Sequence, residues 1–554
     1  MKRAIILLAV CGLTTGAGAQ TMYDALRYSE YDYYGTARTM AMGNAFTALG
    51  GDLGGIMINP AGSAVAGYSQ VVLTPSVNIA VNNAQGTYFN GKPNGFERQT
   101  RRSAARFTLP SIGFTLNLET HRTRGLKNVS IGFVASGASY FNDNLRASGS
   151  NASTSFMGAL AYNTSGWDIS DLTISDPFRN SYAPWESIVG WEAGLISLYG
   201  PDSNTSEYIG TSEAYEFLGG DPNNLSNYSI SQAGTLDQQY GRSVRGSRYE
   251  YLINMGMNFS DKFYFGFNIG ITSLDYSYQD WIMEAAQNPS DFSLTFNNAD
   301  GSVSETEFSD MNFNYRYNAT GVGVYGKFGF IARPVAGLRV GGAIQTPTST
   351  VIKEFWSYSA ASYYTDSRFN AGSQSPEGEY RYRLVSPFRF NVGLAYTFGN
   401  FGLISADYEM CDYSGMRFRV TENDSESTFD ADNADIREFM GASHMLRAGI
   451  EVKPLAALSV RAGYGRTTSP ERYYEDNVKK AVKANKNSFS AGLGYSSAGS
   501  FFADLAFRAT RYPDEYVYPY SDYIFDSEGG YFPSPEILNR KWMYDVMLTI
   551  GFRF

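Results

Sequence analysis

Residues 542–554 read Trp-Met-Tyr-Asp-Val-Met-Leu-Thr-Ile-Gly-Phe-Arg-Phe, and the character of the side chains alternates along them. One face carries only aromatic and aliphatic residues, whereas the other carries Asp545, Thr549 and Arg553. Alternation with a period of two predicts a β-strand. The first face suits lipid, the second suits a polar lumen, and the aromatic residues at both ends suit membrane interfaces. A strand of a soluble β-sandwich also alternates, so this segment alone leaves both folds open.

The same alternation recurs along the chain and distinguishes the two folds. In residues 263–271, for example, Phe and Ile alternate with Tyr, Gly and Asn. Fourteen segments alternate in this way: 69–83, 103–118, 127–142, 244–259, 263–283, 308–333, 338–352, 379–397, 401–417, 443–453, 458–467, 487–496, 500–512 and 540–554. An even number of such strands predicts an all-β fold, a transmembrane antiparallel β-barrel of about 14 strands.

The connections between these segments alternate between short and long. The short ones are 119–126, 260–262, 334–337, 398–400, 454–457 and 497–499. The long ones are 84–102, 143–243, 284–307, 353–378, 418–442, 468–486 and 513–539, of which 143–243 is predicted to be a long extracellular loop. Short turns on one side and long loops on the other are typical of outer-membrane barrels, in which closure pairs every backbone polar group. An even strand count puts both barrel ends on the short-turn side, so we expect residues 20–67 in the periplasm or the lumen.

Composition excludes several classes of function. Only 18% of the residues are charged, against about 25% in soluble chains, while 15% are aromatic. The net charge of −10 argues against nucleic acid as a partner, because phosphate contacts need clustered Lys and Arg. Two His and two Cys make a metal centre or a disulfide framework improbable. The sequence has no G-x-S-x-G motif. We therefore expect no enzyme activity and no cofactor.

The first nineteen residues predict export. Lys2 and Arg3 precede an apolar stretch over residues 4–13, and Ala17-Gly18-Ala19 is a small-residue cleavage box. This stretch is too short to span a bilayer and is typical of a secretory signal. The predicted organisation is a signal peptide over 1–19, an N-terminal hatch or plug over 20–67, and a transmembrane barrel over 68–554. The predicted location is the outer membrane of a Gram-negative cell.

A Gly- and Ala-rich motif lies ahead of the first strand. Residues 35–52 read Gly-Thr-Ala-Arg-Thr-Met-Ala-Met-Gly-Asn-Ala-Phe-Thr-Ala-Leu-Gly-Gly-Asp, and Asn59-Pro60-Ala61-Gly62 follow. Small residues fold tightly in a confined space, and Pro60 keeps Asn59 out of the helical region; a periplasmic linker is the alternative. With residues 109–114, 329–334 and 338–341, this motif resembles the FadL/TodX family of outer-membrane transport proteins for hydrophobic compounds.

The resemblance implies passive transport of long-chain fatty acids or similar lipophilic molecules. In that family, extracellular loops capture the cargo, a lumen pocket receives it, the hatch moves, and the cargo leaves sideways at a kink in the third strand. A wall opening suits such cargo because each buried methylene contributes about 0.8 kcal/mol, which a water-filled channel would forfeit. The matching hatch or gate residues are Phe46, Asn59, Pro60, Ala61 and Gly62, and the candidate lateral opening comprises Gly132, Ser136 and Gly137. Glycines that merely accommodate barrel curvature are the alternative.

The long loop contains an apolar helical pattern. Residues 184–198 place Trp185, Ile188, Trp191 and Leu195 near helical spacing, with Pro184 at a plausible first turn. One interpretation is a hydrophobic groove for ligand capture at the mouth of the barrel. The other is a lid whose apolar face packs on the barrel rim.

Alternate residues of a strand face the same side, and the arginines that should face the lumen are candidate anchors for a ligand carboxylate. These are Arg339, Arg389, Arg447 and Arg461, with Arg508 on the same parity. Acidic residues share this parity: Asp407, Glu409, Glu451, Asp504 and Asp545. Buried charges need partners, so mutual salt bridges inside the lumen are the alternative.

Other functions and partners remain open at this point. A general porin or a surface adhesin of the outer membrane is the main alternative, and an outer-membrane lipase is a lesser one. A porin conducts ions steadily in a planar bilayer, whereas a plugged hydrophobic channel is nearly silent. The expected partners are hydrophobic cargo, outer-membrane lipids and lipopolysaccharide, and the barrel-assembly machinery through the C-terminal Phe554.

Overall fold

The protein is described from a computed structural model, which covers residues 21–89, 92–93, 95–297, 302–421, 429–524 and 531–554. The predicted signal peptide lies outside the described residues. No helix within these ranges has the length and apolar character needed to cross a bilayer.

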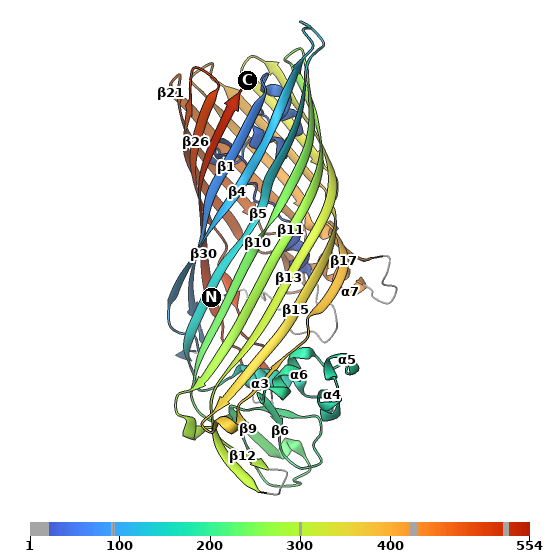
Figure 1. Cartoon of the computed structure of the whole chain (residues 1–554), viewed down its shortest axis with the longest axis vertical. Coiled ribbons are helices and arrows are strands. Elements are labelled where there is room, and N and C mark those ends of the chain that lie inside the picture. Colours follow the sequence, from blue (N-terminus) through green and yellow to red (C-terminus); the bar gives the residue numbers. More distant parts are fainter. Residues whose placement is uncertain (1–20, 90–91, 94, 298–301, 422–428, 525–530) are drawn as a thin grey trace.

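The described chain forms a closed antiparallel β-barrel of fourteen wall strands, as predicted (Figure 1). Closure is made by β1 and β30, which pair from Gln70↔Arg553 to Gly86↔Ile537. The wall strands are β1 (Gln70–Gly86), β4 (Thr100–Glu119), β5 (Leu126–Asn151), β10 (Leu236–Phe259), β11 (Phe263–Ala286), β13 (Val303–Val335), β14 (Leu338–Gln345) with β15 (Ser349–Tyr364), β17 (Gly378–Val385) with β18 (Arg389–Thr397), β19 (Gly402–Asp412) with β20 (Arg417–Val420), β21 (Ala442–Leu455), β22 (Leu458–Thr468), β25 (Asn485–Ser496), β26 (Phe501–Arg511) and β30 (Ile537–Arg553).

Three wall strands are each interrupted once along their length. Pro347 separates β14 from β15, and Pro387 separates β17 from β18. Proline has no N–H to donate to a ladder, which accounts for both breaks. The 3-10 turn η6 (Tyr413–Gly415) separates β19 from β20.

Many strands are longer on the loop side than the alternation predicted. The predicted strand 244–259 begins at Leu236, and the predicted strand 127–142 continues to Asn151. The loop predicted over 143–243 is therefore confined to 152–235. The reason is that a ladder continues to pair outside the bilayer, where one face no longer has to be apolar, so the alternation stops before the strand does.

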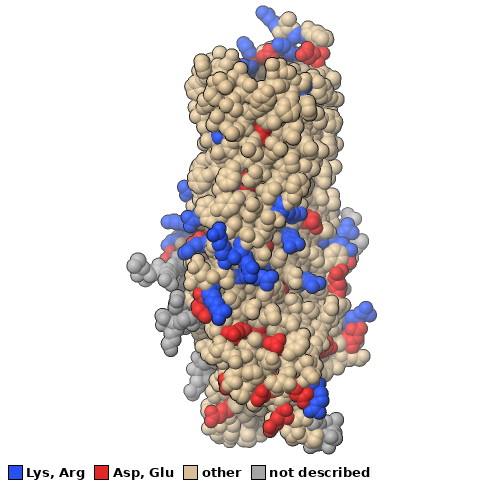
Figure 2. All heavy atoms as spheres, turned by 60° about the vertical axis from the view of Figure 1, so that its left-hand side comes forward, with Lys and Arg blue, Asp and Glu red and all other residues tan. Residues whose placement is uncertain are grey.

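Both ends of the barrel lie on the short-turn side, as the even count predicted. The Ser69 N–H donates to the Phe554 carbonyl at 3.1 Å, and the Phe554 N–H donates to the Ser69 carbonyl at 3.0 Å. The wall nearest the short turns is almost free of charged side chains (Figure 2). On β10, Tyr251, Ile253 and Met255 are exposed on the outer surface, whereas Glu250 and Asn254 between them are buried in the lumen.

The loop between β5 and β10 forms a small outer domain, whose hydrophobic core is shared with the barrel rim. The Ser155 hydroxyl begins its first helix by accepting from the Met157 and Gly158 N–H groups. Its elements are α3 (Phe156–Thr164), α4 (Ile169–Thr173), α5 (Pro177–Asn180), α6 (Trp185–Glu192), β6 (Ile196–Leu198), β7 (Tyr208–Gly210), β8 (Glu213–Phe217), η3 (Leu225–Asn227) and β9 (Tyr228–Gln232). Smaller elements of other loops are β2 (Tyr88–Phe89), β3 (Lys92–Pro93), η4 (Pro289–Asp291), β12 (Ser293–Asn297), η5 (Ser367–Phe369), β16 (Ala371–Gln374), α7 (Asp430–Phe439), β23 (Arg472–Glu475), β24 (Val478–Ala481), β27 (Glu515–Val517), β28 (Tyr523–Ile524) and β29 (Tyr531–Phe532).

Residues 21–67, here named the plug segment, lie inside the barrel (Figure 1). They form α1 (Met22–Ser29), α2 (Ala37–Ala41), η1 (Leu53–Met57) and η2 (Pro60–Val65), and nearly all of residues 33–64 are buried. Glycines of the wall make room for them. A Cβ on Gly266, Gly329, Gly341, Gly449 or Gly463 would collide with the plug segment. The glycine content of these strands is thus explained by the backbone that fills the lumen.

Candidate functional site

Asn59 joins two parts of the plug segment to the wall. Its side-chain N–H group donates to the Thr47 carbonyl at 2.6 Å and to the Phe330 carbonyl of β13 at 3.0 Å. Its side-chain oxygen accepts from the Ala61 N–H at 3.1 Å, which caps η2. Pro60 occupies the first position of η2, where no donor is needed. The predicted gate residues Asn59 to Gly62 are therefore brought together at one junction between plug and wall.

Charged side chains of the wall hold the rest of the plug segment. Arg38 of α2 pairs with Glu451 of β21 at 2.9 Å and lies 5.5 Å from the centre of the buried Phe46 ring. Asp407 accepts from the N–H and the hydroxyl of Thr47, each at 2.8 Å. Lys327 donates to the Met57 carbonyl at 2.8 Å. Side-chain contacts such as these, and not a continuous backbone ladder, hold this part of the plug segment against the wall.

The inward arginines are already neutralised, which favours the salt-bridge alternative. Arg389 pairs with Glu409 at 3.1 Å, and Arg447 pairs with the same carboxylate at 3.2 Å. Arg461 bridges Glu451 and Asp504. Arg389, Arg447 and Arg461 thus each have a carboxylate partner within the protein, and their binding of a ligand carboxylate stays a prediction. The fourth candidate, Arg339, donates to the Leu49 carbonyl of the plug segment.

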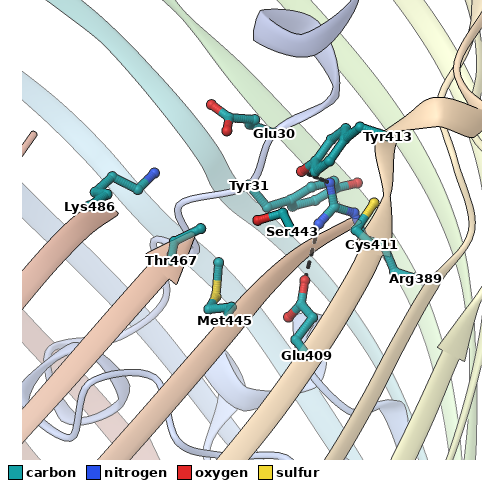
Figure 3. A pocket seen from close by; sticks show the side chains of 10 residues that line it. All are labelled: Glu30, Tyr31, Arg389, Glu409, Cys411, Tyr413, Ser443, Met445, Thr467 and Lys486. Atoms are coloured by element: carbon teal, nitrogen blue, oxygen red, sulfur yellow. Dashed lines mark hydrogen bonds and ion pairs between the residues drawn. The ribbon is translucent and has the colours of Figure 1, made fainter. Parts of the chain in front are cut away.

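Two small cavities lie where residues 30–34 of the plug segment meet this charge network. In the first, Arg389 points towards Glu409 and lies against Tyr31, whose ring centre is 4.2 Å from the guanidinium carbon (Figure 3). The second is lined by Tyr33, Tyr34 and Tyr512 among others. Sequence reasoning missed this region, although the run Glu-Tyr-Asp-Tyr-Tyr over 30–34 is unusually aromatic for a linker. No group of three potential metal ligands is found among the described residues.

The wall has a break between β4 and β5. Their ladder runs from Glu119↔Asn128 to Ser111↔Ser136 and ends there. Beyond this point β4 stays paired with β1 and β5 stays paired with β10. We name the unpaired stretch, residues 100–110 of β4 facing residues 137–147 of β5, the seam.

The plug segment takes the place of β4 at the start of the seam. The Tyr34 N–H donates to the Gly137 carbonyl at 2.9 Å, and the Asp32 N–H donates to the Ala138 carbonyl at 2.8 Å. The Ser136 hydroxyl donates to the Tyr34 carbonyl at 2.6 Å. The predicted residues Ser136 and Gly137 are thus located where the wall opens. Gly132 lies elsewhere, in the regular ladder opposite Thr115 and Asn254. The pairing of β5 with β10 contains a β-bulge, and this bulge is at Ala138.

Among the described residues, side chains make the hydrogen bonds that cross the seam, and a backbone bond from the Arg98 N–H to the Ser148 carbonyl lies just beyond its outer end. The Tyr249 hydroxyl donates to the Leu109 carbonyl at 3.1 Å and lies 2.9 Å from the Tyr140 hydroxyl. Asn142 donates to the Ala104 carbonyl at 3.1 Å, and Arg106 donates to the Gly246 carbonyl at 2.7 Å. Rotation of a few side chains opens such a boundary, whereas a backbone ladder has to be unzipped.

The predicted capture residues lie mostly inside the outer domain. Ile188 of α6 and Leu195 are fully buried in the core that this domain shares with the barrel rim. Trp185 packs against Phe178 and Trp356, and Trp191 packs against Tyr208. The burial of Ile188 and Leu195 favours the packed lid, and ligand capture by this loop stays a prediction. The sequence pattern was correct, but the surface that the apolar face covers is set by tertiary packing.

Two buried carboxyls make the stability of this outer domain depend on pH. Burial raises the pKa of Glu186 to about 8, and burial likewise raises the pKa of Glu213 to about 8. A carboxyl with a folded pKa above its unfolded value stabilises the fold at acid pH, and this contribution is lost as the pH rises through the folded value.

We therefore expect the outer domain to loosen between pH 5 and pH 9. Hydrogen exchange in α6, corrected for intrinsic rates, should be at least about tenfold faster at the higher pH. Glu186→Gln should flatten this dependence, and Glu192→Gln, an exposed change on the same helix, should leave it intact. Equal exchange at both pH values in the unsubstituted protein would show that these carboxyls carry no such linkage.

Comparisons with known proteins bear on the fold. No protein-family model and no curated protein sequence matches the chain. The crystal structure of the P. putida toluene transporter TodX is similar, with a TM-score of 0.50, 12% identity, and coverage of 94% of this chain and 99% of that one. A Pseudomonas aeruginosa FadL homologue gives a TM-score of 0.47 at 11% identity over 94% and 98% of the two chains. The Ralstonia pickettii toluene transporter TbuX gives 0.41 at 12% over 94% and 99%. At this identity the likeness to TodX establishes a shared fold, a fourteen-stranded barrel preceded by an N-terminal segment.

Proposed function

We propose that this chain, which has the fold of TodX, is an outer-membrane channel that passes hydrophobic compounds sideways through its wall. The observation that carries the proposal is the seam, where β4 and β5 part while the plug segment blocks the axis. A lipophilic molecule that leaves through the seam enters the bilayer directly and never crosses the buried charges around Arg389, Arg447 and Arg461.

The route in this proposal begins at the outer domain and follows tyrosines along the lumen. Neighbouring ring centres are 4.9 Å apart for Tyr358 and Tyr315, 6.5 Å for Tyr315 and Tyr317, and 6.2 Å for Tyr317 and Tyr276. Tyr28 of the plug segment is 5.6 Å from Tyr276. These rings offer apolar faces to a cargo from the rim to the plug, which supports fatty acids or aromatic hydrocarbons as the class transported.

The proposal includes the organisation and the partners of the chain. Residues 1–19 would direct export, residues 20–67 would act as the movable hatch, and residues 68–554 would form the barrel. Phe554 would be recognised by the barrel-assembly machinery. The side with short turns would face the periplasm, as in other outer-membrane barrels. The proteins of similar fold are transport channels, which supports a role without catalysis.

Uptake in a deletion strain tests the function. Cells that lack this protein should take up long-chain fatty acids or aromatic hydrocarbons several-fold more slowly than cells in which it is restored, with both classes offered side by side. A water-soluble sugar serves as the control, and its uptake should not change. Equal uptake of every lipophilic compound with and without the protein would reject the proposal and favour an adhesin. Restored sugar uptake would favour a general porin.

A further inference from the structure

Arginines gather on the outer surface at the edge of the apolar part of the wall. Figure 2 shows Lys and Arg side chains around the middle of the molecule, next to the wall region without charge. On β4, Phe107 is 71% exposed on the outer face, and Arg101 follows on the same face. Arg101 and Arg540 lie on either side of Asn83 of β1 in one row of the sheet. The wall thus changes from apolar to basic within a few residues.

Two further arginines meet at the seam. Arg146 of β5, Gly241 of β10 and Trp281 of β11 form one row across three strands. Gly241 has no side chain, so the Trp281 ring lies over it and the Arg146 guanidinium carbon reaches to 4.4 Å from the ring centre. This stacking holds the Arg146 charge on the outer surface. Across the seam, the Thr100 hydroxyl of β4 donates to the Arg146 carbonyl, and Arg102 is two residues further along β4.

Acidic groups do not balance this pair. Among the described residues, no carboxylate lies within ion-pair distance of Arg102 or Arg146, whereas Arg389, Arg461 and Arg508 of the lumen have such partners. Asp514 lies 3.6 Å from Arg540 and 3.7 Å from Arg511, on the neighbouring strands. Two arginines on facing strands of the seam without a counter-charge favour a bound anion, and arginine binds phosphate oxygens with two parallel hydrogen bonds.

We propose that Arg146, Arg101 and Arg540 on the outer face, joined by Arg102 from around the unpaired edge of β4, bind the phosphates of a glycolipid of the outer leaflet, of the lipid A type. The apolar wall next to them, including Phe107, would receive its acyl chains. A phosphorylated amphiphile fits both surfaces at once, whereas free phosphate fits only the arginines. The bound lipid would lie across the outer part of the seam. This inference rests on the proposed placement in the outer membrane and does not depend on which cargo is carried.

Native mass spectrometry of the purified protein in detergent tests the site. The probes are bisphosphorylated lipid A, the same lipid without its phosphates, and inorganic phosphate as competitor. We expect the bisphosphorylated lipid to bind at least about tenfold more tightly than the dephosphorylated one, as expected for hydrogen bonds to charged groups. Millimolar inorganic phosphate should not displace it. Arg102→Gln with Arg146→Gln should remove the preference.

The matched control is Arg122→Gln with Arg124→Gln, two exposed arginines in the short turn at the opposite end of the barrel. This control should bind lipid A like the unsubstituted protein, and a heat-dependent shift in gel mobility checks that each variant is folded. Equal binding of both lipids, unchanged binding in the Arg102/Arg146 variant, or an equal loss in the control would overturn the proposal. Displacement by inorganic phosphate would show a simple anion site instead. Because binding is measured without cargo, a failure here leaves the uptake experiment unaffected, and the reverse also holds.

Discussion

Deleting residues 21–65 is expected to convert a nearly silent channel into one that conducts ions steadily. A barrel of fourteen strands is too wide for its own side chains to fill, and the plug segment now occupies that space. The lumen that the deletion exposes is lined by charged residues such as Asp407 and Glu409. Conductance in a planar bilayer should therefore rise by about tenfold or more, towards that of a small porin.

A milder variant keeps this prediction testable if the deletion impairs folding. Asn59→Ala removes the side chain that ties Thr47 to the Phe330 carbonyl and leaves buried carbonyls unpaired, at a cost of about 1–3 kcal/mol. In the planar bilayer, the Asn59→Ala variant should show brief openings that conduct ions. Asn223→Ala, an exposed change in the outer domain, is the control and should remain silent. A folded deletion variant that conducts no better than the intact protein would refute the assignment of residues 21–67 as the plug.

The barrel could be predicted from the sequence because every second residue of a wall strand faces lipid and has to be apolar. Alternation alone yields the fourteen strands, the position of both barrel ends, and the inward direction of Arg389 and Glu409. The resemblance to the FadL/TodX family, and not alternation, directed attention to Gly132, Ser136 and Gly137 of the third strand, where small residues weaken a ladder. Where neither lipid nor lumen constrains a residue, as in the outer parts of β5 and β10, the pattern ends before the strand does.

The site depends on pairings that no local pattern encodes. Arg389 is neutralised because the register of β18 against β19 places Glu409 beside it. The bulge at Ala138, rather than at Gly132, follows from the loss of β4 and the arrival of Tyr34 as a substitute partner. The burial of Ile188 depends on where the outer domain meets the rim. To predict any of these three features, one has to know how segments far apart in the chain are placed relative to one another.

Locking the seam is expected to abolish uptake of hydrophobic cargo. Asn142 of β5 and Ala104 of β4 face each other across the seam, joined by one side-chain hydrogen bond of 3.1 Å. Cysteines at these two positions, bridged by a short bis-methanethiosulfonate linker, would tie the strands together. Every variant also carries Cys411→Ser, so that this native thiol does not react with the linker. If cargo leaves through the seam, the linked protein can bind it but cannot release it to the bilayer.

The matched control links Ser243→Cys to Gln279→Cys, which are opposite each other in the regular ladder between β10 and β11. A linker there joins strands that are already paired along their length, so uptake should be unchanged. Cells that carry either cysteine pair without linker should also take up cargo normally.

The decisive measurement is therefore the rate of uptake of one lipophilic cargo by cells with the Ala104–Asn142 linker, before and after its cleavage with a reductant. We predict uptake near the level of the deletion strain while the linker is intact and full recovery once it is cleaved. Undiminished uptake with the linker verified as intact would contradict release through the wall between β4 and β5.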